Sequence, residues 1–136
     1  MSASAQPAEG GAAGAGELRI LAVTDNEPVR DELEFGFSES VRIEFAHDAR
    51  DALRLLNKDD ETFSAVVVDL QTGAAGGYSL ASDMKATRAL ADVPIVILLE
   101  RQQDAWLARR AGAHSTLLKP VTAAQVLTAL GSHDLQ

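Results

Sequence analysis

Two aspartates and a lysine each stand where a run of apolar residues ends, and this placement suggests phosphoryl-transfer chemistry. Asp25 follows the run Leu18–Val23, Asp69 lies at the end of a second run, and Lys119 follows the run Ser115–Leu118. Two carboxylates at close range repel each other unless a cation neutralises them, and their hard oxygen atoms favour Mg²⁺. A lysine can neutralise a phosphoryl oxygen. Brought together, these groups could move a phosphoryl group onto a carboxylate.

The elements that must position these residues alternate along the chain. Short runs rich in β-branched residues predict strands at Leu18–Val23, Val41–Ala46, Ala65–Leu70, Val93–Leu99 and Ser115–Leu118. The stretches between and after them predict helices at about Glu27–Ser40, Ala49–Asp59, Tyr78–Leu90, Gln102–Ala111 and Ala123–Gly131. We expect Asp48 to be a helix N-cap and Thr122 with Gln125 to form a capping box. Five βα units imply a parallel sheet with helices on both faces.

The pattern within the strands predicts their order in the sheet. Val41–Ala46 alternates between apolar and polar residues, which is typical of a half-exposed edge strand. Ala65–Leu70 and Val93–Leu99 are almost entirely apolar, which is typical of central strands buried on both faces. A second strand at the edge gives the flavodoxin-like order 2-1-3-4-5. In that order ligands bind at the carboxyl ends of strands one and three, just after Val23 and Val68. The two aspartates and the lysine are therefore expected in one crevice.

Composition narrows the class of protein. The chain has 136 residues, and 12 Lys and Arg against 20 Asp and Glu give a net charge of -8, which argues against a nucleic-acid binder. The absence of cysteine excludes thiolate metal sites and cysteine nucleophiles. We expect Met1–Gly16, which lacks large apolar side chains, to be a flexible arm and residues 17–133 to form the domain. No apolar run is long enough to span a membrane.

Four stretches of the chain match a known family. They are ILAVTDNEPVR (Ile20–Arg30), AVVVDLQTGAAGGYSL (Ala65–Leu80), DVPIVILL (Asp92–Leu99) and AGAHSTLLKPVTAAQV (Ala111–Val126). On these stretches the chain resembles the receiver domain of two-component response regulators, the CheY-like family, over about Leu18 to Leu130. The resemblance implies a cytoplasmic signalling protein without enzymatic activity. Its most specific element is the pair Lys119-Pro120, whose peptide bond is expected to be cis.

The resemblance also implies roles for individual residues. Asp69 corresponds to the aspartate that accepts the phosphoryl group, and Lys119 to the lysine that contacts that group. Asp25 corresponds to an acid that binds Mg²⁺ directly, together with Asp69 and the backbone carbonyl of Gln71. Gly77 corresponds to the turn glycine before the third helix. The implied cofactor is therefore Mg²⁺.

Three positions depart from the family's pattern. Thr24 stands where most members have the first acid of an acidic pair, so we expect weaker metal binding. Leu99 stands where the family has the Thr or Ser whose hydroxyl turns toward the phosphoryl group, and neither residue type occurs from Val93 to Ala113. Thr116 stands at the aromatic switch position. The acceptor chemistry is thus expected to be retained in part, without the usual switch relay.

Two functions of different classes follow. The first is a single-domain response regulator that accepts a phosphoryl group on Asp69 from a sensor histidine kinase or a phosphotransfer protein. Because the chain ends soon after the fifth predicted helix, its output is expected through protein contacts, on the face formed by the fourth helix, the fifth strand and the fifth helix. The alternative is a phosphorylation-independent pseudo-receiver that acts as a scaffold or adaptor, and Thr24 and Leu99 motivate it.

Other classes fit the sequence poorly. A haloacid-dehalogenase-like phosphatase needs a second aspartate two residues after its nucleophile, and Gln71 occupies that position. The glycine-rich turn Gly73–Gly77 lacks the Gly-Lys-Ser/Thr ending of a P-loop, so ATP binding is not expected there. Flavin binding is a more distant alternative, and a yellow preparation would reveal it.

Several residues have ordinary interpretations beside functional ones. Asp25 could be the N-cap of the following helix. His47, His114 and His133 have no metal-ligand spacing and are expected as surface or turn residues. Trp106 is expected in the core, whereas an exposed position would mark a binding face. The acids of the segment 25–39 are expected on a solvated helix face, with an electrostatic docking surface as the sharper alternative.

Overall fold

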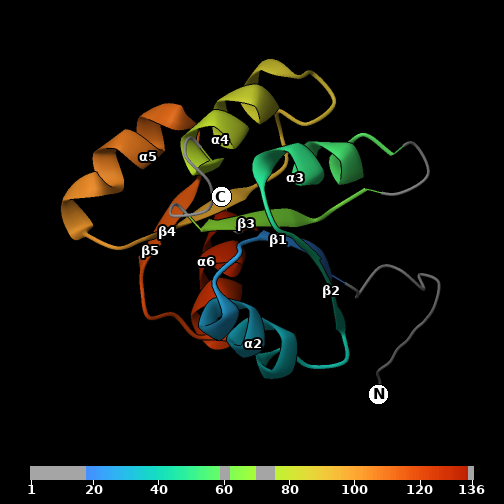
Figure 1. Ribbon diagram of the computed structural model, residues 1–136, viewed down its shortest axis with the longest axis vertical. Coiled ribbons are helices and arrows are strands. Elements are labelled where there is room, and N and C mark those ends of the chain that lie inside the picture. The colour runs from blue at the N-terminus through green and yellow to red at the C-terminus, as the bar shows by residue number, and fades with distance from the viewer. Residues whose placement is uncertain (1–17, 59–61, 70–75, 135–136) are drawn as a thin grey trace.

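The computed structural model describes residues 18–58, 62–69 and 76–134 and has a five-stranded parallel sheet. The strands are β1 (Leu18–Val23), β2 (Val41–Ala46), β3 (Ala65–Asp69), β4 (Ile95–Leu99) and β5 (Ser115–Leu118). Their order is β2-β1-β3-β4-β5, as predicted, so β2 is an edge strand (Figure 1). The α-helices are α2 (Glu27–Gly36), α3 (Ala49–Leu56), α4 (Gly76–Ala86), α5 (Ala105–Ala111) and α6 (Ala123–Asp134).

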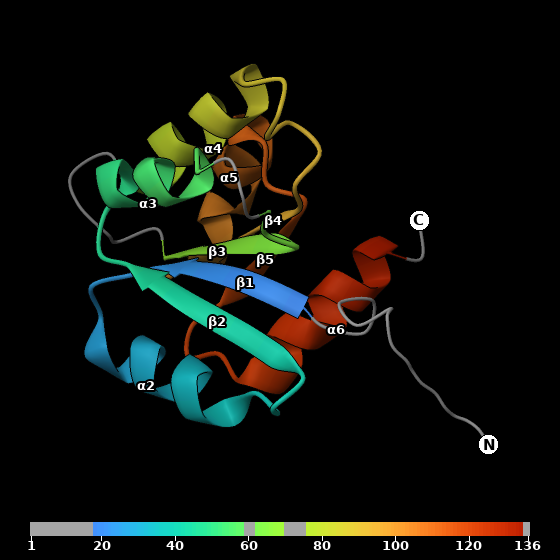
Figure 2. The same ribbon diagram turned by 90° about the vertical axis from the view of Figure 1, so that its right-hand side faces the viewer.

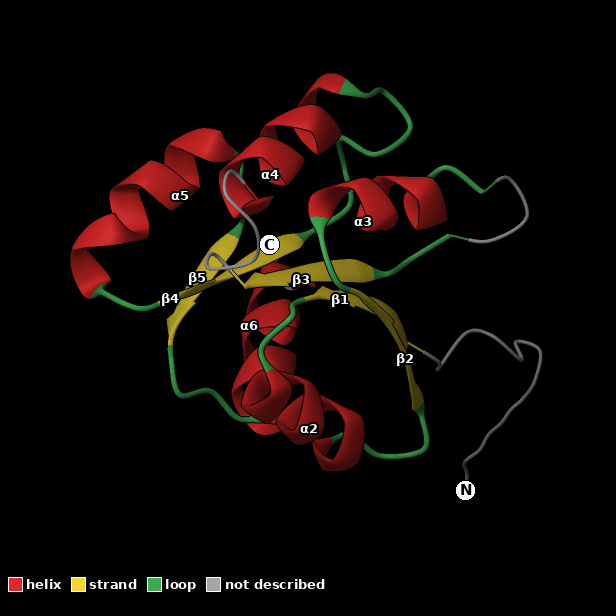
Figure 3. Ribbon diagram, viewed as in Figure 1, coloured by secondary structure: helices red, strands yellow, loops and turns green. Residues whose placement is uncertain are grey.

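The helices form a layer on each side of the sheet. Helices α2 and α6 cover one face, while α3, α4 and α5 cover the other, as the side view and the view coloured by secondary structure both show (Figures 2 and 3). Each strand of a parallel sheet must cross back over a face to reach the next, which places the helices there. The predicted flavodoxin-like three-layer architecture is therefore confirmed.

The strand residues alternate between two cores. On β1, Leu21 and Val23 pack under α3, α4 and α5, whereas Ile20 and Ala22 pack under α2 and α6. All five residues of β3 and all five of β4 are buried. Burial on both faces explains why the central strands read as almost unbroken apolar runs. Within the described residues, no helix is both long and apolar enough to cross a membrane.

Strand positions were predicted more closely than helix ends. Strands β1, β2 and β5 have the predicted bounds, while β4 starts two residues later than predicted, after Pro94. Helix α2 ends at Gly36 instead of Ser40, because Phe37 takes an extended conformation. Helix α4 begins at Gly76 rather than Tyr78, so Gly77 lies in its first turn and not before it. The predicted arm Met1–Gly16 lies outside the described residues.

Four other helix boundaries also differ from the prediction, the first being the end of α3, which lies at Leu56 instead of Asp59. Helix α4 ends at Ala86 instead of Leu90. The predicted helix 102–111 is a 3₁₀ turn, Gln102–Asp104, followed by α5. Helix α5 ends at Ala111, and its C-cap residue Gly112 has a φ of 121°, which lies in the left-handed region that favours glycine. Helix α6 continues past Gly131 to Asp134.

Side-chain caps fix where the helices begin. Asp48 accepts a hydrogen bond from the backbone of Asp51 at 2.8 Å, which confirms it as the N-cap of α3. The predicted capping box at the start of α6 is confirmed, with the backbone of Thr122 donating to the Gln125 side chain at 2.9 Å and the reverse bond at 3.1 Å. The cap of α2 is Asn26, not Asp25. Asn26 Oδ1 accepts from the backbone of Val29 at 3.1 Å.

A hydrogen bond connects α2 to the start of α6, just after the short loop that follows β5. The Glu32 carboxylate accepts a hydrogen bond from the backbone N–H of Ala123, the first residue of α6, at 3.1 Å. Gly36 lies against the same residue, where an added Cβ atom would be only 2.8 Å from the Ala123 Cβ atom. Glycine at this position therefore permits the close approach of the two helices.

Candidate functional site

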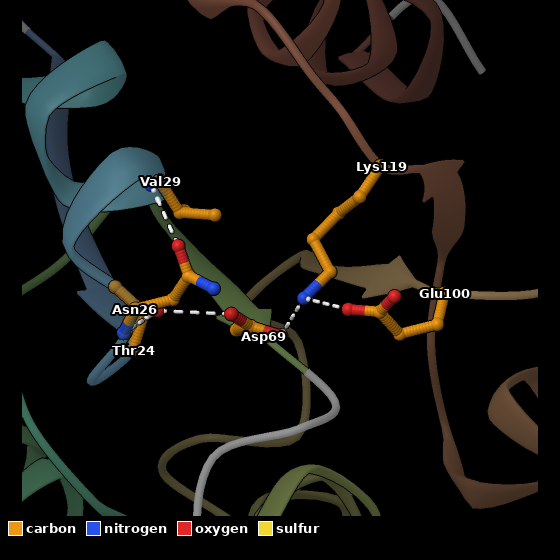
Figure 4. Close-up of polar contacts among 6 residues, drawn as sticks. All are labelled: Thr24, Asn26, Val29, Asp69, Glu100 and Lys119. Atoms are coloured by element: carbon orange, nitrogen blue, oxygen red, sulfur yellow. Dashed lines mark hydrogen bonds and ion pairs between the residues drawn. The ribbon is translucent and has the colours of Figure 1, made fainter.

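Asp69 is the last residue of β3 and is 1% exposed, so a carboxylate is buried at the carboxyl end of a central strand. A buried charge is costly unless it is paired and hydrogen-bonded. Two side chains from neighbouring parts of the sheet provide those contacts. Thr24 follows β1 and contacts Oδ2, while Lys119 follows β5 and contacts Oδ1 (Figure 4). The ends of β1, β3 and β5 therefore meet around Asp69 as predicted, but among the described contacts it is Thr24, and not the predicted Asp25, that reaches Asp69 from the end of β1.

The Thr24 side chain has a direct part in this arrangement. Its hydroxyl donates to Asp69 Oδ2 at 3.0 Å and accepts the backbone N–H of Asn26 at 3.0 Å. The Thr24 backbone N–H donates to Ala46 at the end of β2, and Thr24 is only 2% exposed. Sequence reasoning treated this position only as a missing acid. The structure shows that the threonine also stabilises the buried carboxylate.

Lys119 connects two carboxylates. Its Nζ atom lies 2.8 Å from Asp69 Oδ1 and 2.7 Å from Glu100 Oε2, while its side chain is only 9% exposed. Its backbone N–H donates to the carbonyl of Leu99, and the Lys119-Pro120 peptide bond is cis, as predicted. Burial lowers the pKa of the ammonium group, but hydrogen bonds to Asp69 and Glu100 more than offset that effect and raise it. The lysine is therefore held in its charged form.

Glu100 is the member of this cluster that the sequence did not suggest. It directly follows β4, and its side chain is 48% exposed at the mouth of the site. The pairing of Leu99 with Leu118 across β4 and β5 makes Glu100 and Lys119 the next pair along the two strands. The strand order together with this register could therefore have indicated the contact.

The metal ligands implied by the sequence are represented in part. Asp25 lies two residues past β1 and is exposed, and Asp69 lies on the adjacent strand β3. Hard carboxylate oxygens from adjacent strand ends are donors that suit Mg²⁺. Gln71 lies outside the described residues, and among the residues that are described no group of three His, Asp or Glu side chains is arranged to hold a metal ion. The carboxylates of Asp25 and Asp69 are donors of the chemical type that Mg²⁺ prefers.

The other two unusual positions lie within the strands. Leu99 is 1% exposed and packs in the core under α3, α4 and α5, so an apolar side chain occupies the position of the expected hydroxyl. Thr116 is partly buried in β5, paired with Ile97 of β4. The Leu99 side chain therefore belongs to the core packing of the sheet.

Four further expectations concerned residues outside the cluster. Trp106 is 56% exposed on α5, so the expectation of a core position is wrong. His47 is exposed beside Asp48, as expected. His114 is partly buried, and its Nδ1 atom accepts the Ile95 backbone N–H at 3.0 Å, so it supports the start of β4. The His133 side chain is outside the described set.

The acidic segment was also placed correctly. Its acids Glu27, Asp31, Glu34 and Glu39 are exposed on or just after α2, which agrees with a solvated face. Of the predicted turn Gly73–Gly77, residues 73–75 lie outside the described part.

Comparison with known proteins agrees with this geometry. Residues 20–131 match the family model described as the response regulator receiver domain. A gliding motility regulatory protein of Myxococcus xanthus is 30% identical over 114 residues, which are 81% of this chain and 14% of that protein. The chain therefore spans a small part of the length of this curated relative.

Solved structures share the fold. The receiver domain of a sensor histidine kinase from Pseudomonas aeruginosa has a magnesium ion coordinated in its active site cleft. It is 25% identical, with a TM-score of 0.74, over 85% of this chain and 96% of its own. A chemotaxis response regulator of Vibrio cholerae superposes with a TM-score of 0.76 at 21% identity, over 85% of this chain and 98% of its own.

Proposed function

Because this chain belongs to the response regulator receiver domain family, we propose that it accepts a phosphoryl group on Asp69 and transmits a signal through protein contacts. The observation that carries the proposal is the buried Asp69 carboxylate held 2.8 Å from the Lys119 ammonium. A carboxylate nucleophile and a fixed positive charge are what such a transfer needs. We propose a signalling role rather than an enzymatic one.

The proposed phosphoryl transfer needs no oxidant or reductant. An Asp69 oxygen forms a bond to phosphorus as the bond from phosphorus to the donor breaks, which is a P–N bond in a phosphohistidine donor. The donor imidazole keeps the electron pair of that bond and takes up a proton. Lys119 neutralises negative charge on the phosphoryl oxygens and on the carboxylate. The product is an acyl phosphate on Asp69.

Magnesium is the cofactor that we propose for this site. Asp69, Asp25 and the backbone carbonyl of Gln71 would hold it, and it would neutralise charge on the phosphoryl oxygens. Thr24 contributes a hydroxyl where an acid would add a second negative charge. We therefore expect weak binding of magnesium, with phosphorylation that stops when a chelator removes the metal. The P. aeruginosa receiver domain supports this assignment through the magnesium ion in its cleft.

The proposed partners are a sensor histidine kinase or phosphotransfer protein as donor and a protein effector as target. An effector surface on α5, β5 and α6 is supported by exposed apolar side chains. Trp106 and Leu107 on α5 and Leu118 on β5 are all at least 40% exposed. An apolar hollow between β5 and α6 is lined by Leu117 and Ala124 among others. Exposed tryptophan is frequently a hot spot of protein interfaces.

One experiment tests the phosphoryl acceptor. The chain is incubated with Mg²⁺ and phosphoramidate, and its intact mass is measured over time. We expect the mass of one phosphoryl group to be added to the wild type and to a Glu34→Gln variant, which changes an exposed acid on α2. Asp69→Asn should remove the adduct, and so should a chelator. A wild-type chain that gains no mass would overturn the proposal.

The Asp69→Asn variant also distinguishes the proposed function from the alternative, a phosphorylation-independent scaffold. A phosphorylation-independent scaffold should bind its effector equally well with Asp69→Asn, whereas a phosphorylation-dependent regulator should lose binding. A pull-down with phosphorylated wild type and Asp69→Asn distinguishes the two.

A further inference from the structure

Glu100 gives the lysine of the site a second anionic partner. The Lys119 ammonium lies between Asp69 Oδ1 and Glu100 Oε2, at 2.8 and 2.7 Å, and Glu100 lies on the side of Lys119 away from Thr24 (Figure 4). An ammonium group has three N–H donors. Two of them are directed to carboxylates in this structure. A phosphoryl group that needs Lys119 must therefore share it with Asp69 and Glu100.

The two carboxylates are not equally free to release the lysine. The Asp69 side chain is fully buried at the end of β3, whereas the Glu100 side chain is 48% exposed. A half-exposed carboxylate can exchange its lysine contact for water at little cost, but a buried one cannot. Glu100 is therefore the partner that gives way when another anion reaches Lys119.

The charge of Glu100 also acts on the incoming group. A phosphodonor brings negative charge into a site that already contains the Asp69 carboxylate. Glu100 adds another negative charge within contact distance of the same lysine. Like charges at this range repel, and because Glu100 is half-exposed, salt screens its part of this repulsion.

We propose that Glu100 is an inhibitory anion that limits how fast Asp69 is phosphorylated. It does so by occupying Lys119 and by repelling the phosphodonor. This inference rests on the proposed function, because it concerns the rate at which the same aspartate takes up a phosphoryl group. Glu100 is not itself the reacting group: it changes the rate of phosphorylation through its contact with Lys119, and Asp69 is the residue that reacts.

The experiment compares initial rates of phosphorylation by phosphoramidate in the presence of Mg²⁺, followed by intact mass. Glu100→Gln removes the charge but keeps an acceptor for Lys119, and Glu100→Ala removes both. Glu34→Gln is the matched control, since it removes one exposed negative charge on α2. We expect the Glu100→Gln rate to exceed the wild-type rate about tenfold at low salt, from the loss of one nearby charge. Glu100→Ala should be at least as fast, and Glu34→Gln should match the wild type.

A second readout excludes a merely structural effect. The rates are repeated at high salt, where the advantage of Glu100→Gln should shrink because the repulsion is screened. Thermal unfolding of the variants should match the wild type, as expected for a half-exposed side chain.

The outcomes separate the two proposals. If the wild type is phosphorylated and Glu100→Gln reacts no faster, the inference about Glu100 is wrong while the proposed function stands. If neither the wild type nor a Glu100 variant gains the phosphoryl mass, both are overturned. An adduct on Glu100→Gln but not on the wild type supports the inhibitory role and contradicts the function proposed for the wild-type chain.

Discussion

The two sides of the Asp69 carboxylate are built differently. On the β1 side, Oδ2 receives a hydrogen bond from the neutral hydroxyl of Thr24, which is itself tied to the backbone of Asn26. On the β5 side, Oδ1 receives a charged hydrogen bond from Lys119, whose ammonium is shared with the half-exposed Glu100. One side is fixed by short side chains and backbone bonds. The other ends in a long side chain with a partner that can be exchanged.

This difference suggests that the two sides of Asp69 have different roles. A hydroxyl held between a backbone N–H and a carboxylate has little freedom to move, so the Thr24 side sets the position of Asp69. The Lys119 side can rearrange, because a lysine stem has several rotatable bonds and Glu100 reaches solvent. When an anion enters the site, we therefore expect the side chains of Lys119 and Glu100 to move and Thr24 to stay in place.

The largest effect is expected when the charged side is removed. Lys119→Met leaves the buried Asp69 carboxylate without its cation, which should reduce the free energy of unfolding at neutral pH by about 3 kcal/mol. Urea denaturation measures this change. Lys85→Met, which removes an exposed lysine of α4, is the control and should have little effect. A loss no larger than the control's would show that the pair does not stabilise the fold.

The ion pair between Lys119 and Asp69 should also be lost when Lys119 is deprotonated at high pH. The pKa of Lys119 is raised above its ordinary value of 10.5 in the folded state. Because the folded-state pKa is raised, the stabilisation is complete below the unfolded-state pKa of about 10.5 and is lost as the pH rises through the folded-state pKa. The stability difference between wild type and Lys119→Met should therefore shrink in strongly alkaline solution. Urea denaturation over a pH series checks this, and a difference that grows with pH would contradict it.

A smaller loss is expected on the neutral side. Thr24→Val keeps the shape of the side chain but removes the hydroxyl, so Asp69 and the Asn26 backbone each lose a hydrogen bond. The expected cost is about 2 kcal/mol in the free energy of unfolding, measured by urea denaturation. Thr24→Ser retains the hydroxyl and should recover most of that loss. Equal stabilities of the Val and Ser variants would show that the hydroxyl contributes nothing.

The smallest loss of stability is expected for Asn26, whose backbone N–H donates to the Thr24 hydroxyl. Asn26→Ala removes the N-cap of α2 and should cost about 1 kcal/mol. Asn26→Asp retains an oxygen acceptor and should restore the cap. Thermal unfolding of both variants is sufficient to compare them. An effect of Asn26→Ala as large as that of Lys119→Met would mean that the β1 side dominates the stability of the site.

The sequence predicted that Asp69 and Lys119 lie close together because Asp69 ends one strand and Lys119 follows another, and the carboxyl ends of strands in a parallel sheet share one edge. Strand bounds were readable for the same reason, since apolar runs end sharply at polar residues. Helix ends were harder. The prediction carried α2 through to Ser40, but Phe37 leaves the helix and packs against the core under α2 and α6. Long-range packing decided that boundary.

The contacts around the acceptor were less predictable. Glu100 begins an ordinary polar loop segment, and nothing local distinguishes it from its neighbours. Its contact with Lys119 depends on the register between β4 and β5. Thr24 was assessed by the charge that it lacks, whereas its contribution is a hydrogen bond to a residue 45 positions away. Both contacts arise from tertiary placement, which residue type alone does not encode.

The hydrogen bond between Glu32 and Ala123 has a consequence for insertions. The chain between Lys119 and Ala123 is attached at both ends, to the Leu99 carbonyl and to the Glu32 carboxylate. This stretch acts as a spacer of set length between the site and α2. One added residue within 120–122 would displace either the lysine or the start of α6. An added residue in the turn after Ala86, between α4 and β4, would meet neither attachment, so tolerance to insertion should differ sharply between these two connections.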